Sequence, residues 1–156
     1  MKKLLMTAAA FLLLCACGGS GDKAALHYRG LSMALPVAQF ADSLTARGFA
    51  LDSAASDSGR TLVFTAPRSA FRLLVAFTGD TVRVIQENYK ASSNDSTRQL
   101  WQQLRDDFER ELGSWPNCPM LKEDHRIANF ETEGGFIAVT LENTYSPNLN
   151  VRYTAK

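Results

Sequence analysis

The chain has 156 residues, of which 46% are hydrophobic and 21% are charged. This length and composition fit a single folded domain and exclude an intrinsically disordered chain. The formal net charge is +1, and no long run of one sign occurs. We therefore expect no nucleic-acid partner, because binding nucleic acid requires a basic face.

The first sixteen residues have the pattern of an export signal. Lys2 and Lys3 give it a positive start, and Leu4 to Leu14 form an apolar stretch that only Thr7 interrupts. The stretch is too short to cross a hydrocarbon core of about 30 Å as a helix. It predicts a signal peptide over residues 1–16. Its removal leaves 15 of the 17 basic residues beside all 16 acidic ones.

The segment Leu14-Cys15-Ala16-Cys17 ends this stretch. It resembles the lipobox of bacterial lipoproteins, in which a branched apolar residue and two small residues precede the modified cysteine. The resemblance implies cleavage before Cys17 and lipid on its sulfur. Cys15 is the rival anchor, but Leu14 is too large for the position before a lipidated cysteine. Two or more acyl chains bind a membrane stably, so we expect a firm anchor.

The residues after Cys17 predict a tether. Gly18-Gly19-Ser20-Gly21 has no side chains to pack, so residues 17–25 should be a lipidated cysteine with a flexible linker. A single domain should follow over residues 26–156. No Asp follows Cys17, which, by resemblance to enteric lipoproteins, implies the outer membrane. With Cys17 lipidated and Cys15 removed, Cys118 has no disulfide partner.

Periodicity and turn residues predict the elements of this domain. In chain order they are a helix over 36–47, strands over 49–51, 61–66, 71–77 and 81–88, a helix from Ser96 to Leu112, and strands over 125–132, 136–142 and 149–153. The turn at Gly79-Asp80 places Thr78 opposite Thr81. The same register puts Arg72 opposite Glu87, which is a favourable cross-strand ion pair.

The second helix and the hairpin after it also have specific signals. Ser96 and Gln99 match a capping box, and Trp101 belongs to an apolar stripe on one helix face. Gly113 ends the helix, and we expect Trp115 to pack beneath that end. In the hairpin, pairing Glu133 with Phe136 sets Phe130 against Val139 and Ala128 against Leu141.

These elements indicate an α+β fold with one antiparallel sheet of about six to seven strands and two helices on one face. The order also suggests two α-β-β-β halves, near residues 30–90 and 91–156. The segments around Phe40, Gly48-Phe49, Trp101 and Pro116 resemble small uncharacterised bacterial envelope lipoproteins. The element order is similar to the β-lactamase-inhibitor-protein fold, which some envelope-assembly lipoproteins share and use to bind proteins.

Few residues suggest chemistry. Glu123 and His125 lie two apart in a predicted strand, so both could reach one metal ion with help from His27. Cys118 with His125 resembles a nucleophile–base pair, but no activating partner is evident. Trp101 and Trp115 could stack on a sugar, although both fit packing roles. We therefore expect no catalytic residue, no cofactor and no metal site.

Three functions remain as predictions. The first is a membrane-anchored, non-catalytic binding or assembly accessory of the cell envelope, with a protein partner held by the open sheet face or an edge strand. The second is a small-ligand or carbohydrate-binding lipoprotein with an aromatic-lined pocket between helices and sheet or around Trp115. The third is a hydrolase or metal-dependent enzyme that uses Glu123, His125 and Cys118.

Overall fold

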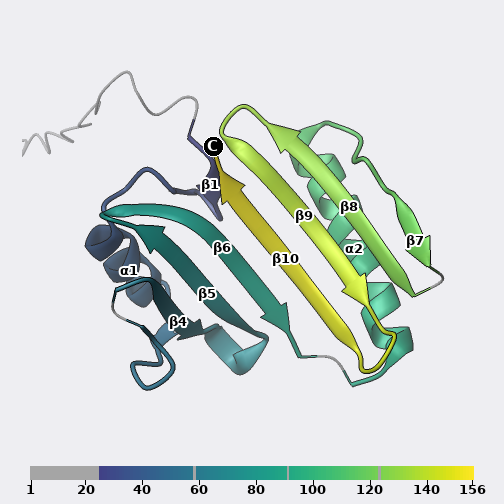
Figure 1. Ribbon diagram of the computed structural model, residues 1–156, viewed down its shortest axis with the longest axis horizontal. Helices are drawn as coiled ribbons and strands as arrows, with labels where there is room; N and C mark the ends of the chain where they lie inside the picture. The colour runs from purple at the N-terminus through teal and green to yellow at the C-terminus, as the bar shows by residue number, and fades with distance from the viewer. Residues whose placement is uncertain (1–24, 58, 91, 123) are drawn as a thin grey trace, which may run out of the picture.

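The computed structural model describes residues 25–156 except 58, 91 and 123. The predicted signal peptide, Cys17 and the tether therefore lie outside the described residues. The described chain has the predicted α+β class, with two helices and a large antiparallel sheet (Figure 1). The sheet has eight strands in the order β3-β4-β5-β6-β10-β9-β8-β7, and a separate hairpin pairs β1 with β2.

The elements and their bounds are β1 (His27–Tyr28), β2 (Leu31–Ser32), α1 (Val37–Ala46), β3 (Ala50–Leu51), β4 (Thr61–Thr65), a 3-10 turn (Pro67–Ser69), β5 (Phe71–Thr78), β6 (Thr81–Tyr89), α2 (Asn94–Leu112), β7 (Met120–Lys122), β8 (His125–Thr132), β9 (Gly135–Glu142) and β10 (Asn148–Ala155). No described helix has the length and apolarity needed to cross a membrane.

The sheet consists of two similar halves. In each half, a helix precedes a meander of four strands: α1 precedes β3 to β6, and α2 precedes β7 to β10. The halves join where β6 pairs with β10 in the middle of the sheet (Figure 1). The sequence analysis anticipated the two halves but not the short strand β7 or the β1–β2 hairpin, because two- and three-residue strands have too few residues to show alternation.

The core lies between this sheet and the two helices. Alternate residues along the strands point to the same face and are buried there, including Leu73, Ile85 and Val151. Phe40 and Leu44 of α1 belong to this core. The indole N–H of Trp101 in α2 donates to the Val139 carbonyl oxygen at 3.0 Å. The predicted core role of Trp101 is therefore confirmed.

The β5–β6 hairpin has a bulge that the sequence did not reveal. Thr78 pairs with Thr81 as predicted, but the register shifts between Ala76 and Phe77. Because a bulge adds one residue to one strand, the side chains beyond it change partners. Glu87 lies opposite Leu73, not Arg72. The predicted Arg72–Glu87 pair is thus wrong.

The β8–β9 hairpin is shifted by two residues from the prediction. Thr132 pairs with Gly135, so the turn is Glu133-Gly134 and Phe130 faces Ile137. The buried face is unchanged because a shift of two keeps every side chain on its side of the sheet. Gly135 begins β9, and the position requires glycine because a Cβ there would lie 2.1 Å from the Thr154 carbonyl oxygen.

Helix α2 begins earlier than predicted. Its N-cap is Ser93, whose hydroxyl accepts from the Ser96 backbone N–H at 3.2 Å, and the Ser96 hydroxyl accepts from the Ser93 N–H at 3.1 Å. The capping box is therefore Ser93/Ser96 and not Ser96/Gln99. The helix ends at Gly113, which has φ of 62°, as predicted.

Candidate functional site: a cleft above a buried carboxylate

A charged residue, Glu87, lies on the buried face of β6. Its neighbours on that face are Ile85 and Tyr89, since side chains alternate along a strand. Only 1% of Glu87 is exposed. A buried carboxylate is costly unless it is paired and hydrogen-bonded, so its surroundings define a built polar site.

Three side chains satisfy the Glu87 carboxylate. The Tyr28 hydroxyl donates to Oε1 at 2.8 Å, and the Tyr89 hydroxyl donates to Oε2 at 2.7 Å. The Arg29 guanidinium lies against Oε1, with Nε at 3.0 Å and Nη2 at 2.9 Å. Both carboxylate oxygens are therefore occupied.

The tyrosines at this site are held in the neutral form. Burial raises the pKa of Tyr28, Tyr89 and Tyr153, and the nearby Glu87 charge raises it further. Burial alone would lower the pKa of Arg29, but the charge and hydrogen bond of Glu87, together with Tyr28 and Tyr89, raise that pKa overall. The network thus consists of one cation, one anion and neutral hydroxyl donors.

The turn of the β1–β2 hairpin positions Arg29. Arg29 and Gly30 have φ of 48° and 77°, the combination of a two-residue hairpin turn whose central positions favour glycine. Arg29 tolerates this backbone while its side chain is held by Glu87 and lies over the Phe71 ring at 5.1 Å. The Arg47 guanidinium donates to the Arg29 carbonyl oxygen at 2.5 Å. Helix α1 therefore helps to fix the turn.

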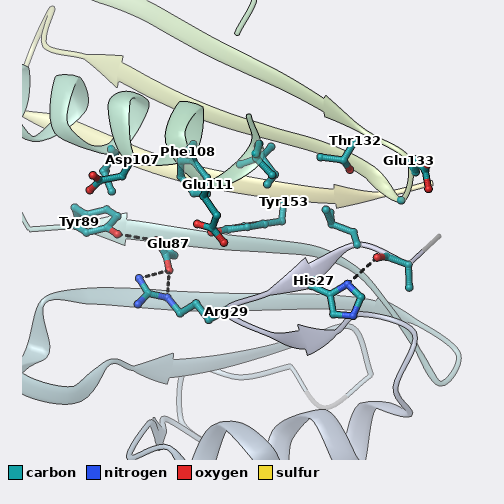
Figure 2. Close-up of a pocket in the computed structure, with 16 residues that line it drawn as sticks. His27, Arg29, Glu87, Tyr89, Asp107, Phe108, Glu111, Thr132, Glu133 and Tyr153 are labelled. Carbon is teal, nitrogen blue, oxygen red and sulfur yellow. Dashed lines mark hydrogen bonds and ion pairs between the residues drawn. The ribbon is translucent and has the colours of Figure 1, made fainter. Parts of the chain in front are cut away.

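A cleft of about 430 Å³ opens above this network. Figure 2 shows it between the β1–β2 hairpin and α2, with β6 and β10 between them. Its apolar lining comes from α2, the sheet and the start of the described chain: Leu26, Tyr89, Leu104, Phe108, Leu112, Ile137 and Tyr153. The cleft lies where the two halves of the domain meet, so neither half forms it alone.

Acidic residues dominate the charged lining of the cleft. Beside the paired Glu87 and Arg29, the lining includes Asp107, Glu111 and Glu133. Asp107 pairs with Arg110 at 3.0 Å. Within the described part of the chain, Glu111 and Glu133 have no cationic partner within 4.0 Å.

The two histidines do not meet. His27 is exposed at the cleft, where its Nδ1 lies 2.9 Å from the Ala25 carbonyl oxygen. His125 begins β8 and lies 3.0 Å from a Glu142 carboxylate oxygen. The cleft includes Thr132, at the other end of β8, and seven steps of strand span about 23 Å. The structure thus separates the two rings.

The other residues considered for chemistry are also scattered. Glu123 lies outside the described residues, and Cys118 is an exposed free cysteine. Among described residues, no group of three or more His, Cys, Asp or Glu side chains could hold a metal ion. Trp115 is 89% exposed, so the prediction that it packs beneath the end of α2 is wrong.

The buried site was not recognised from the sequence, because the predicted register pairs Glu87 with Arg72 instead of Leu73. One signal was available: Ile85, Glu87 and Tyr89 alternate with the polar residues Gln86 and Asn88. A carboxylate within the apolar set of an alternating strand indicates a buried charge that needs a partner. Nothing local identifies Arg29 as that partner, since it is 58 residues away.

Comparisons with known proteins add little to this picture. No protein-family model matches the chain, and no curated protein matches it. A solved structure, a DUF4309 family protein (YjgB) from Bacillus subtilis subsp. subtilis str. 168, is similar at a TM-score of 0.49. It is 14% identical over 86% of this chain and 90% of that one. The likeness bears on neither ligand nor activity.

Proposed function

We propose that the protein is a non-catalytic, lipid-anchored binding protein of the cell envelope, and that the cleft binds a small ligand. The observation that supports this is a concave, largely apolar surface above one buried and fully paired ionic group. Small-molecule sites have this composition: apolar and aromatic walls with a few polar groups in fixed positions.

The buried ionic group at the base of the cleft is better suited to a structural role than to general-base catalysis. A general base must have an oxygen or nitrogen free to take a proton from a substrate. Both Glu87 oxygens already accept hydrogen bonds from Tyr28, Arg29 and Tyr89. The network is suited to hold the hairpin and the cleft wall in one geometry.

The predicted lipid anchor would place the cleft close to the membrane. Ala25 lines the cleft, and Cys17 precedes it by eight residues in the sequence. An extended chain spans at most about 3.6 Å per residue, so lipid on Cys17 would keep the cleft within about 30 Å of the membrane. The ligand would then be a molecule of the envelope.

This function can be tested by identifying small molecules that remain bound to the protein during purification. Full-length protein would be purified from the envelope that contains it, extracted with solvent and analysed by mass spectrometry. Glu111→Trp fills the mouth of the cleft, whereas Gln102→Trp places the same ring on an exposed part of α2 outside the lining. We expect a small molecule with the wild type and Gln102→Trp, and its loss with Glu111→Trp. Equal retention by all three would contradict the proposal.

The protein-binding accessory predicted from the sequence would use the sheet face that the helices leave uncovered. That face combines half-buried apolar side chains, such as Leu74 and Val84, with polar ones, such as Gln86 and Arg152. We favour the cleft because it joins concavity to a buried charged group. If no molecule is retained by the wild type, the accessory becomes the leading proposal.

A further inference from the structure

The charge of the cleft lining indicates which class of ligand the cleft would bind. This inference rests on the proposed function. At the base of the cleft, Arg29 and Glu87 neutralise each other. On the wall, Asp107 is paired with Arg110. Among the described lining residues, the unpaired charge is that of Glu111 on α2 and Glu133 on the β8–β9 turn, which are both negative and exposed.

The charge of Arg29 is already balanced by Glu87. Its Nε and Nη2 both lie against the same Glu87 oxygen, and its guanidinium lies over the rings of Phe71 and Tyr28 at 5.1 and 5.7 Å. An anionic ligand would meet this neutral pair and not a free cation, with the carboxylates of Glu111 and Glu133 also in the lining. The net negative charge of the lining therefore disfavours an anionic ligand.

Lys156 does not cancel the negative charge. Its ammonium lies 3.7 Å from Glu131 and 5.4 Å from the Phe136 ring centroid. Both of these residues alternate with Phe130 and Ile137, so they belong to the uncovered face of the sheet. The amine also donates to the Thr132 carbonyl oxygen at 3.3 Å. Its ion pair is therefore with Glu131 and not with Glu111 or Glu133.

Glu111 adjoins the aromatic lining. Figure 2 shows its carboxylate extending from α2 toward Tyr153, and its charge is one of those that raise the pKa of Tyr153. The Phe108 ring packs against Tyr153 with centroids 6.1 Å apart. A carboxylate beside aromatic rings is a favourable setting for an organic cation, which gains both an ion pair and cation–π attraction.

We propose that the cleft selects a small amphipathic cation: an organic amine whose charged group lies at Glu111 against Tyr153 and whose apolar part contacts Phe108, Leu112 and Ile137. The apolar part of the ligand would complement the apolar lining, and its amine would complement the unpaired carboxylates of Glu111 and Glu133.

Three probes with one apolar group test this selection: 4-phenylbutylamine, 4-phenylbutan-1-ol and 4-phenylbutyrate. Full-length protein would be held in phosphatidylcholine nanodiscs, and bound probe measured by equilibrium dialysis with empty nanodiscs as background. We expect the amine to bind about tenfold more tightly than the alcohol, and the carboxylate to bind least. Raising the salt concentration should weaken binding of the amine only.

Two matched variants localise the effect. Glu111→Gln removes an exposed charge of the cleft, and Glu131→Gln removes an exposed charge of the uncovered face. We expect Glu111→Gln to lower the amine affinity about tenfold, to that of the alcohol, with the alcohol unaffected, and Glu131→Gln to change neither. Equal binding of all three probes, or equal effects of the variants, would overturn the cation selection while the cleft remains a binding site. No binding of any probe would overturn the selection, and the retained-molecule experiment would decide the proposed function separately.

Discussion

The guanidinium of Arg29 lies 2.9 Å from the carboxylate of Glu87, and this ion pair attaches the first hairpin of the domain to the middle of the sheet. The two side chains differ greatly in exposure, at 49% for Arg29 and 1% for Glu87. That difference makes the pair asymmetric, because a charge left alone at the surface is hydrated and a charge left alone inside is not.

Removing either partner should therefore have unequal effects. Arg29→Met leaves the buried Glu87 without a cation, and we expect the free energy of unfolding to fall by about 3–5 kcal/mol. Glu87→Gln leaves Arg29 partly hydrated and keeps an acceptor for the tyrosine hydroxyls, so we expect a fall of about 1–3 kcal/mol. Urea denaturation of both variants measures this. A larger loss with Glu87→Gln would contradict the asymmetry.

Alkaline pH should destabilise the protein through its buried tyrosines. The pKa values of Tyr28, Tyr89 and Tyr153 are raised in the folded state, so folding favours their protonated form. This stabilisation is complete below the unfolded pKa of about 10 and is lost as the pH rises above it. Each tyrosine should lower stability by up to about 1.4 kcal/mol per pH unit there.

Absorbance of tyrosinate near 295 nm provides the measurement. The three buried tyrosines should add nothing to this signal between pH 10 and 11 in the folded protein, and should contribute fully when the protein is unfolded in urea at the same pH. Full ionisation of all four tyrosines in the folded chain would show that the network around Glu87 does not protect them.

Substitution of Gly135 should strongly destabilise the fold. A Cβ at this residue would lie 2.1 Å from the Thr154 carbonyl oxygen in the neighbouring strand, so Gly135→Ala forces β9 and β10 apart. We expect a loss of about 3 kcal/mol in the free energy of unfolding, read from thermal or urea denaturation. Gly59→Ala is the control, since its Cβ would meet only an ordinary contact at 3.5 Å, and it should change stability by less than about 1 kcal/mol.

The start of α2 can be tested by its cap. Ser93→Ala removes the acceptor for the Ser96 N–H and should cost about 1 kcal/mol. Gln99→Ala should be nearly neutral, because Gln99 is exposed and is not part of the observed capping box. If Gln99→Ala were the more destabilising of the two, the helix would begin at Ser96, as its sequence pattern suggested.

Local signals were enough for most of the elements. The spacing of apolar residues predicted both helices and the long strands, because burial of one face imposes a period of 3.6 in a helix and of 2 in a strand. Gly48 and Gly113, with φ of 86° and 62°, ended the helices because glycine adopts that backbone without strain. The α+β class followed from the order of these elements.

Register and partners could not be predicted in the same way. Because of the bulge at Ala76/Phe77, Glu87 lies in the core and not in the expected pair with Arg72. The alternation in β6 indicated the burial of Glu87, but no residue of the hairpin marks the position of the bulge. The β8–β9 hairpin turns at Glu133-Gly134, and not at Gly134-Gly135 as predicted. This turn puts Gly135 in β9, where it packs closely against Thr154 of β10, a strand distant in sequence. The registers of both hairpins thus depend on contacts between elements.

The sequence by itself determined the class of fold, the helices and the buried face of most long strands, because these features depend on residues close together in the chain. The export signal and its Cys17 anchor stay predictions of the same local kind. Only the tertiary structure decided that Tyr28, Arg29, Glu87 and Tyr89 form one network and that a cleft opens above it. The cleft exists because β6, α2 and the first hairpin converge, and convergence is set by the packing of the whole core rather than by any local pattern.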